Sequence, residues 1–250
     1  MSYSVTLGQI YPATKKVFHN HPYKKDLEAN VIAIKDGHVV LDKTIFYAES
    51  GGQDFDTGFI NNTKVVNVQD QLGQMLYLKG GAVEVPSVKV DTIIVHKIEG
   101  ETDFCVGETV KLMIDWDRRY KLMRNHSASH FLFFAANAIA REKIGEKLFT
   151  KGCHISVDGA RFDFSYDIPS EWIPDIEALA NEQISRGLEI EMKAEPESTE
   201  IFYWTYGDDI IIPCGGTHVK SATELGKITV KRRKQGKGTT RLGFDGVAGE

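Results

Sequence analysis

The chain has 250 residues, a formal net charge of −5 and 42% hydrophobic residues, an ordinary composition for a soluble globular protein. This length suffices for one large domain or two small ones around a buried core. No apolar stretch approaches the length of a membrane span, and the N-terminus lacks the basic start and apolar run of a signal peptide. Three widely spaced cysteines argue against a disulfide framework and favour a reducing compartment. We therefore expect a cytoplasmic protein without a membrane partner.

The first part of the chain, residues 1–115, is expected to form a small β-barrel or sandwich. In residues 29–47, two apolar runs flank Asp36-Gly37, a dipeptide that is typical of a hairpin turn. Residues 58–81 and 90–115 show the same pattern, in which polar turns separate short β-branched runs. Several short strands separated by turns favour a closed or sandwiched all-β unit, and we assign residues 1–115 to a β-barrel domain.

The pattern changes at residue 116, where a long and largely buried helix is expected. Apolar and small residues recur at helical spacing between Tyr120 and Ala138, Asp115 or Asp117 is suited to cap the start, and Gly145 is suited to the end. A second helix is expected over 169–187, with Ser170 as its cap and Gly187 as its stop. The remaining strand candidates are residues 151–159, 160–167, 188–196, 201–207, 209–213 and 226–233.

These elements predict the fold class α+β, with long helices packed on one face of a mostly antiparallel sheet in residues 116–250. No segment rich in proline, glycine and serine separates this part from the barrel. We therefore expect the N-terminal barrel to pack directly on the C-terminal α+β domain.

Two pairs of residues have the spacing of metal ligands. His126 and His130 stand four apart in the long helix and so lie on one face, one turn apart. Cys214 and His218 are also four apart, and the two glycines that follow Cys214 favour a tight turn that brings thiolate and imidazole together. Three histidines and one cysteine are typical of a Zn²⁺ site and poorly suited to Mg²⁺ or Ca²⁺. Position 127 is Ser, so the glutamate of a His-Glu-x-x-His protease is missing.

A basic strip at residues 227–241 contains no acidic residue. The strip is either a solvated strand end and loop or a surface that faces nucleic-acid phosphates, which would make binding sensitive to salt. Lys231, Arg232 and Arg233 are its candidate phosphate-binding side chains.

Five segments, in order along the chain, resemble motifs of the editing domain of alanyl-tRNA synthetase. "HSASH" and "PCGGTHV" are similar to that domain's two metal-binding motifs, and "WDRRYKLMRNHSASH" resembles the start of its first long helix. "FYAESGGQ" matches the glycine-rich motif of the preceding barrel, "ARFDFSYD" a strand that follows, and "GKGTTRLGFDG" the closing motif. No aminoacylation domain is evident. The chain therefore resembles the free-standing alanyl-tRNA editing proteins (the AlaX group) of the medium-length type.

The resemblance implies ATP-independent trans-editing, in which tRNA(Ala) mischarged with serine or glycine is hydrolysed. It also implies that His126, His130, Cys214 and His218 bind zinc, and that Gln53 belongs to the active-site rim. Gly51 and Gly52 would let the backbone approach the terminal adenosine. A site that rejects alanine needs groups that read the serine hydroxyl, and Ser127, Ser129, Thr217 and Gln53 are the candidates. Gln53 and Cys214 are the residues that we expect to matter most for catalysis, and His154 is a general-base candidate by residue type alone.

Two alternatives stay open from the sequence. The chain could be a zinc-stabilised RNA-binding module whose four-ligand site is closed and supports no turnover. It could also be a deacylase for Ser-tRNA(Thr), because threonyl-tRNA synthetase has a related editing domain with similar His and Cys motifs. Neither the glycine activity nor the oligomeric state follows from the sequence.

Overall fold

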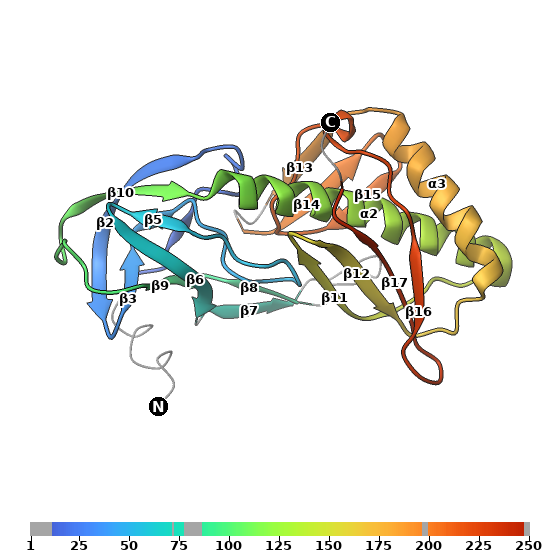
Figure 1. Ribbon diagram of the computed structural model, residues 1–250, viewed down its shortest axis with the longest axis horizontal. Helices are drawn as coiled ribbons and strands as arrows, with labels where there is room; N and C mark the ends of the chain where they lie inside the picture. Colours follow the sequence, from blue (N-terminus) through green and yellow to red (C-terminus); the bar gives the residue numbers. More distant parts are fainter. Residues whose placement is uncertain (1–11, 72, 78–86, 197–199, 248–250) are drawn as a thin grey trace.

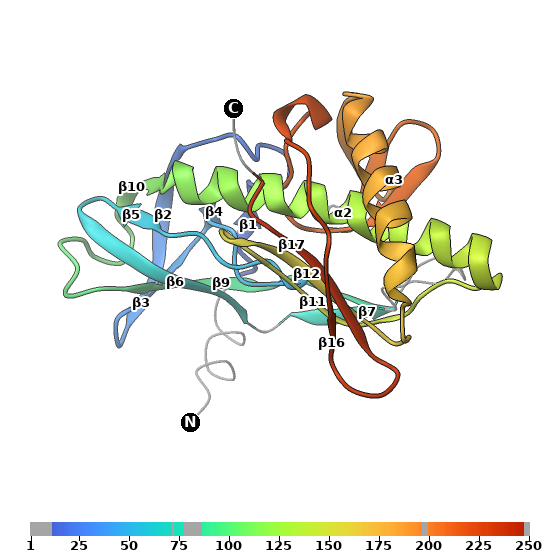
Figure 2. The same cartoon turned by 45° about the vertical axis from the view of Figure 1, so that its right-hand side comes forward.

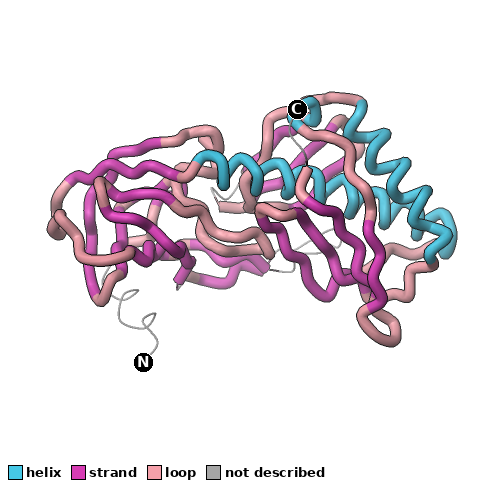
Figure 3. The backbone as a smooth tube through the Cα atoms, viewed as in Figure 1, coloured by secondary structure: helices cyan, strands magenta, loops and turns pink. Residues whose placement is uncertain are grey.

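One long helix, α2 (Trp116–Ile144), joins a group of β-strands on one side of the molecule to a layered α+β part on the other (Figure 1). The computed structural model describes residues 12–71, 73–77, 87–196 and 200–247. Helices and mostly antiparallel sheets occur together, which confirms the α+β class. The expected long helices on one face of one sheet are not found: among the described elements, two antiparallel sheets follow residue 116, and α2 alone is a long helix. Figure 3 shows that the strands gather on both sides of α2. Among the helices that the structure describes, none combines the length and the apolar character required to cross a bilayer.

The N-terminal strands form a closed six-stranded ring in the order β10-β2-β3-β9-β6-β5. The expected hairpin connects β2 to β3, where Lys35 pairs with His38 and both Asp36 and Gly37 have positive φ. A parallel pair, β1 with β4, and a hairpin, β7 with β8, flank the ring. The strands are β1 (Lys15–Lys16), β2 (Asp26–Lys35), β3 (His38–Leu41), β4 (Lys43–Thr44), β5 (Gly58–Ile60), β6 (Thr63–Gln71), β7 (Gln74–Tyr77), β8 (Ser87–Val90), β9 (Ile93–Ile98) and β10 (Thr109–Ile114).

Inside the ring, the hydrophobic core contains one buried polar pair. His96 is fully buried, and Thr44 Oγ1 lies 2.9 Å from its Nε2 while its Nδ1 lies 3.1 Å from the Val39 carbonyl oxygen. The carbonyl accepts only, so Nδ1 carries a proton and Nε2 accepts from the threonine hydroxyl. Burial lowers the pKa of His96 to about 4, which keeps the ring neutral at pH 7.

This lowered pKa predicts an acid-sensitive barrel. The unfolded chain binds a proton on His96 near pH 6.5, whereas the folded chain binds it only near pH 4. Stability from the neutral ring is therefore complete above pH 6.5 and is lost as the pH falls toward 4, by on the order of 3 kcal/mol. We expect urea unfolding between pH 7.5 and 4.5 to show a smaller loss of stability in His96→Gln than in the wild type. His21→Gln, at an exposed position, is the control and should follow the wild type; an unchanged pH dependence in His96→Gln would contradict the assignment.

Helix α2 begins and ends where its sequence predicts. The Asp115 carboxylate accepts a hydrogen bond from the Arg118 amide at 3.1 Å, and Gly145 takes the left-handed conformation with its amide bonded to the Arg141 carbonyl. The helix is buried along most of its length because it lies between two sheets. Phe131 packs edge-on against Trp204 and Tyr206 of β14, and Phe133 packs against Phe162 of β12.

The two sheets that flank α2 differ in size. One has the order β11-β12-β17-β16 (Figure 2) and the other β13-β14-β15 (Figure 1), and all their pairings are antiparallel. Their strands are β11 (Thr150–Ser156), β12 (Gly159–Phe164), β13 (Ile190–Ala194), β14 (Phe202–Tyr206), β15 (Ile210–Pro213), β16 (Lys231–Lys234) and β17 (Thr240–Asp245). Helix α3 (Ile173–Ser185) packs on α2, and short 3₁₀ turns occupy Ser170–Trp172 and Ala222–Glu224.

Three sequence expectations need correction here. Ser170 does not cap the second helix: a 3₁₀ turn precedes α3, and Trp172, in helical conformation without a side-chain cap, is the residue before it. The strand expected over 226–233 is confined to Lys231–Lys234. Strand β17 was not expected, although it is central in its sheet, because Gly243 interrupts the apolar run and hides the alternation of Thr240, Leu242 and Phe244.

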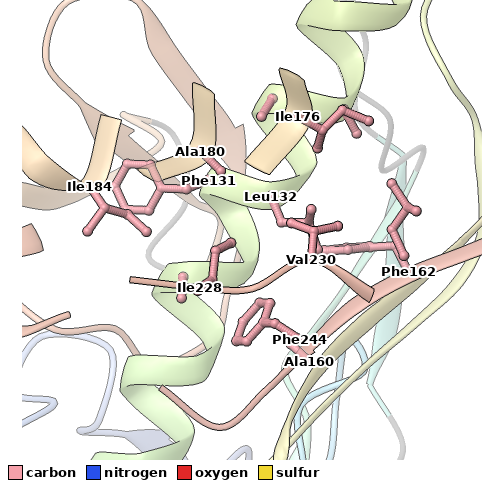
Figure 4. Close-up of a cluster of buried hydrophobic side chains, with 14 of the residues drawn as sticks. Phe131, Leu132, Ala160, Phe162, Ile176, Ala180, Ile184, Ile228, Val230 and Phe244 are labelled. Carbon is pink, nitrogen blue, oxygen red and sulfur yellow. The ribbon is translucent and has the colours of Figure 1, made fainter. Parts of the chain in front are cut away.

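The main hydrophobic core lies around α2 and is filled from several of the elements around it (Figure 4). Phe131 and Leu132 come from α2, and Ile176, Ala180 and Ile184 from α3. The sheet and the segment before it add Ala160, Phe162, Ile228, Val230 and Phe244. Because this core is large and close-packed, it holds the inward face of α2 in a fixed orientation.

Candidate metal centre

Two pairs of side chains that are far apart in the sequence meet at α2. The ligand atoms of His126, His130, Cys214 and His218 all lie within 4.8 Å of one another. The Cys214 sulfur is 3.4 Å from Nε2 of His126 and 3.3 Å from Nε2 of His218. The predicted juxtaposition of the two pairs is therefore present in the fold.

The outer nitrogen of two of the three imidazoles is held by a neighbour. His126 Nδ1 lies 2.7 Å from Oε1 of Gln53, an amide oxygen that only accepts, so Nδ1 carries the proton. His218 Nδ1 lies 3.1 Å from Ser127 Oγ, which also accepts from the Val219 amide. The contact with Gln53 therefore sets the tautomer of His126 in which Nε2 is unprotonated and points at the cysteine sulfur. The Ser127 hydroxyl can donate or accept, so its contact orients the His218 ring and is compatible with either tautomer.

The donor set fits a metal ion. His130 Nε2 is buried and has no hydrogen-bond partner among the described residues, which is costly unless an ion fills that role. Burial lowers the pKa of His126 to about 3 and holds the pKa of His130 and His218 well below the usual value. All three imidazoles are therefore neutral at pH 7 and have lone pairs to donate. One soft sulfur with three imidazole nitrogens suits a transition metal rather than Mg²⁺ or Ca²⁺.

Of the two glycines after Cys214, Gly216 is the one that the packing requires. A Cβ at Gly216 would lie 2.2 Å from Cε1 of His126 and 2.8 Å from Oε1 of Gln53. Only glycine fits at that point of the turn. At Gly215 a Cβ would meet nothing closer than Nε2 of His19 at 4.0 Å, and that ring nitrogen lies 3.1 Å from the Gly215 carbonyl oxygen.

Gln53 reaches the centre from the barrel side and is fully buried. Its Oε1 accepts from His126 Nδ1–H and, at 3.1 Å, from the Thr217 amide, while its Nε2 donates to Thr217 Oγ1 at 2.9 Å. The main chain around Gln53 pairs with Ile155 of β11, which fixes the position of the loop. Gln53 therefore touches a candidate ligand rather than the open space beside it.

The other side chains that were expected to bind the substrate hydroxyl are also buried. Ser127 contacts His218, Ser129 donates to the His126 carbonyl at 2.7 Å, and Thr217 contacts Gln53. None of these side chains is more than 1% exposed, and none lines the cleft. The structure thus gathers all of them around the ligands but brings none to a surface that a substrate could reach.

A cleft of about 870 Å³ opens onto His126, His130 and Cys214. Gly51 lines it, whereas Gly52 lies under Cys153, where a Cβ would come 2.5 Å from the sulfur. His19 and Cys153 also line the cleft, and sequence reasoning assigned neither to the site. His19 packs on Phe202, and burial lowers its pKa to about 4. No spacing pattern connects His19 to the ligands, so only the fold reveals its place.

His154, the expected general base, lies elsewhere. Its Nε2 is 2.9 Å from an Asp54 carboxylate oxygen, and its side chain is 46% exposed. Neighbouring residues of a strand point to opposite faces, so Cys153 and Ile155 line the cleft and His154 does not. The structure gives no support to His154 as a catalytic base.

The basic strip occupies β16 and its hairpin with β17. Every residue of β16 is exposed, and β16 is an edge strand. Lys231 pairs with Asp245, Arg232 Nε donates to the Ile168 carbonyl at 2.6 Å, and Arg241 binds Asp163 through two hydrogen bonds. Arg241 holds the pKa of Asp163 below its usual value. Part of the strip is therefore engaged in the sheet, and charged side chains also protect an edge strand from pairing with other chains.

Comparisons with known proteins agree on one group. A family model described as "tRNA synthetases class II (A)" matches residues 6–118. An alanyl-tRNA editing protein AlaX-M from Pyrococcus horikoshii is 33% identical over 92% of this chain and 96% of its own length. The alanine–tRNA ligases of Methanococcus maripaludis and Hyperthermus butylicus are 30% and 34% identical over 89% and 88% of this chain. The chain spans about a quarter of those ligases.

Fold and site together define an α+β protein with a three-histidine, one-cysteine candidate metal centre at the base of a cleft. The match to the Pyrococcus horikoshii protein covers nearly the whole of both chains, so it identifies the family as well as the class. The chain belongs to the family of alanyl-tRNA editing proteins of the AlaX-M type.

Proposed function

We propose that this protein is a zinc-dependent aminoacyl-tRNA deacylase that removes serine, and secondarily glycine, from mischarged tRNA(Ala). The observation that carries this proposal is the convergence of His126, His130, Cys214 and His218 at the base of a cleft. The homologous AlaX-M protein, whose name describes an alanyl-tRNA editing protein, supports the choice of tRNA. This function would place the protein in the cytoplasm, where charged tRNA is present.

Zinc is the metal that the ligand set favours, because three imidazoles and one thiolate form a typical tetrahedral zinc site. Bound zinc would supply a Lewis acid next to the scissile ester. The chain's own part is orientation: Gln53 sets the tautomer of His126, Ser127 orients the His218 ring, and Gly216 allows the turn to approach His126. The ester that joins an amino acid to the terminal ribose is intrinsically labile, so modest assistance is sufficient.

An editing site is needed because an alanine pocket cannot strongly exclude glycine by size or serine by its added hydroxyl. We propose that residues 1–115 act as a barrel domain that completes the site and residues 116–250 as the editing domain that holds the metal. Gln53 from the first part and His126 from the second are in direct contact, which supports joint action.

A deacylation panel tests this function. We expect rapid hydrolysis of Ser-tRNA(Ala), slower hydrolysis of Gly-tRNA(Ala), and little of Ala-tRNA(Ala) or Ser-tRNA(Thr). A chelator should abolish the activity, and Zn²⁺ should restore it. Preference for Ser-tRNA(Thr) would mean that the substrate is tRNA(Thr) and not tRNA(Ala). RNA binding without any hydrolysis would favour a zinc-stabilised RNA-binding module instead.

Gln53→Ala should lower activity on Ser-tRNA(Ala) by about 10- to 100-fold, the usual cost of removing a partner that orients a metal ligand. Because Gln53 faces His126 and not the cleft, rates on Ser- and Ala-tRNA(Ala) should fall in proportion. Zinc content at saturating metal should stay near one per chain. Gln74→Ala, at an exposed barrel position, is the control. A selective loss of serine preference would mean that Gln53 reads the substrate hydroxyl.

The basic strip is proposed to contact tRNA phosphates. Replacing Lys231 and Arg233 with Ala should raise KM for Ser-tRNA(Ala) and reduce the slope of log affinity against log salt by about one unit or more. Arg232 is left in place in this variant because its guanidinium holds the Ile168 carbonyl. Hydrolysis of a seryl-adenosine ester should barely change. Lys64 and Lys111, exposed on the barrel, provide the matched control pair, and equal damage from both pairs would remove the strip from the tRNA interface.

A further inference from the structure

A second pocket lies apart from the metal centre, among the segment that follows β1, the start of β2, strand β4 and Lys220. Its volume is about 560 Å³, which is within the range of pockets that bind small molecules. None of the four candidate metal ligands lines it. We name it the lysine pocket after the lysines among its described lining residues: Lys15, Lys16, Lys24, Lys43 and Lys220.

The lysine pocket is strongly cationic, and none of the described residues that line it is acidic. The chain as a whole has the opposite balance, with a net charge of −5. Within the part of the chain that the structure describes, Lys16 is the one lysine of the pocket that forms an ion pair, with Glu200. The other four ammonium groups keep their charge without a described carboxylate partner, so the pocket presents an uncompensated positive field to an entering anion.

Strand pairing places two of these lysines side by side. In the parallel pair of β1 with β4, Lys15 lies opposite Lys43, and both line the pocket. Like charges directly opposite each other on paired strands are destabilising. The Asp42 carboxylate, next to Lys43 in the chain, is engaged elsewhere, because it accepts from the backbone and side-chain nitrogens of Asn30 at 2.8 and 3.0 Å. A bound anion would therefore relieve a repulsion that the fold itself creates.

Tyr23 fixes the wall that carries Lys220. The Lys220 ammonium lies 4.9 Å from the centroid of the Tyr23 ring, and the Lys220 amide donates to the Tyr23 hydroxyl at 3.0 Å. The neighbouring Glu224 carboxylate accepts from the Tyr23 and Tyr120 hydroxyls and from the Lys220 and Ser221 amides. Glu224 is thus occupied in holding the backbone, while the Lys220 ammonium lines the pocket.

We propose that the lysine pocket binds a compact cluster of phosphate groups, such as a triphosphate chain or consecutive phosphates of a nucleic-acid backbone. Lysine binds phosphate as a point charge, so several ammonium groups around one cavity suit several phosphate groups. Lys15, Lys43 and Lys220 come from three separate segments and surround one cavity. The inference does not rest on the proposed function, because the pocket contains no candidate metal ligand and the binding involves no hydrolysis.

Calorimetric titration with inorganic tripolyphosphate at low salt tests the site with a small anion. Lys15→Gln with Lys43→Gln should weaken binding by at least about tenfold, because one hydrogen bond to a charged group contributes about that factor. The matched control is Lys64→Gln with Lys111→Gln, which changes the net charge equally at exposed barrel positions outside the pocket. The control should bind as the wild type does. Cys214→Ala should also keep its affinity, because the anion does not bind through the metal centre.

Urea unfolding separates a ligand site from a structural role of the two lysines. Without ligand, Lys15→Gln with Lys43→Gln should be at least as stable as the wild type, because the replacement removes the repulsion between the paired strands. Tripolyphosphate should raise the unfolding midpoint of the wild type and of the control pair, and it should leave the midpoint of the lysine variant unchanged. A folded variant that loses only the response to the anion identifies Lys15 and Lys43 as ligand-binding side chains.

A short RNA duplex that carries no amino acid identifies the source of the phosphates. If the pocket takes a nucleic-acid backbone, the duplex should compete with tripolyphosphate, and the lysine variant should lower the slope of log affinity against log salt by about 1.8, the value for two duplex phosphates. Absence of competition assigns the pocket to a small polyphosphate compound.

If the wild type binds neither probe, or if the lysine variant and the control pair are equally affected, the lysine pocket is not a phosphate site. If the probes bind as expected but the wild type hydrolyses no charged tRNA, the pocket assignment stands and the proposed function fails.

Discussion

Replacement of Cys214 by Ala is expected to reduce hydrolysis of Ser-tRNA(Ala) by at least about 100-fold, the upper end of losses when a metal site is disturbed. Cys214 supplies the only sulfur among the four candidate ligands and contacts two of the three imidazoles. As a thiolate it would neutralise part of the ion's charge, so the variant should also lose bound zinc. The main core around α2 is large enough that far-UV circular dichroism should remain close to that of the wild type.

Cys105→Ala is the control for the Cys214 variant, because Cys105 is exposed in the barrel part and takes no part in the metal group. It should keep both its zinc and its rate. Zinc content and deacylation are to be measured on the same samples. Full activity in a metal-free Cys214→Ala protein would refute a catalytic metal.

The second large effect is expected on stability. Arg119, at the start of α2, is fully buried and ion-paired with Asp56, which is also fully buried. Its guanidinium further donates to the carbonyls of Pro22 and Ile45, so it ties α2 to two segments of the barrel part. Arg119→Met leaves a buried carboxylate without its cation and should cost about 3–5 kcal/mol of unfolding free energy.

Arg118→Met is the neighbouring control. Arg118 is partly exposed, bonds the Phe55 carbonyl and lies 3.7 Å from Asp54, so its loss should cost about 1 kcal/mol or less. Urea unfolding gives both values. The double variant Arg119→Met with Asp56→Leu should recover part of the lost stability, because it no longer buries a lone charge. An Arg119→Met protein as stable as Arg118→Met would show that the buried pair does not hold the barrel to α2.

The sequence predicted well those features that depend only on residues close together in the chain. Asp115 and Gly145 bound the long helix because a capping carboxylate and a left-handed glycine act within one turn. The four metal ligands could be found because each pair is four residues apart and each pair sits in one short segment. The Asp36-Gly37 hairpin was equally local.

What the sequence did not predict depends on contacts between distant segments. Gly243 sits inside a central strand because a Cβ there would lie 2.6 Å from the Ala160 carbonyl oxygen, a constraint that exists only once β12 and β17 pair. The burial of Gln53 and the place of His19 follow from how the barrel meets the Cys214 turn. Ser127, Ser129 and Thr217 have the chemistry of substrate-reading groups, yet packing turns all three toward the ligands.

The contact between Gln53 and His126 makes metal occupancy and barrel docking thermodynamically reciprocal. The loop that carries Gln53 is held by main-chain hydrogen bonds to Ile155, so the same few residues serve the interface and the ligand geometry. If docking of the barrel raises the affinity for metal by some factor, bound metal raises the equilibrium constant for docking by the same factor. Loss of the ion would therefore weaken the contact between the barrel part and the rest of the chain, although the ion itself is not part of that contact. The amide hydrogens of Asp54 and Ile155 would then exchange with solvent faster when metal is removed.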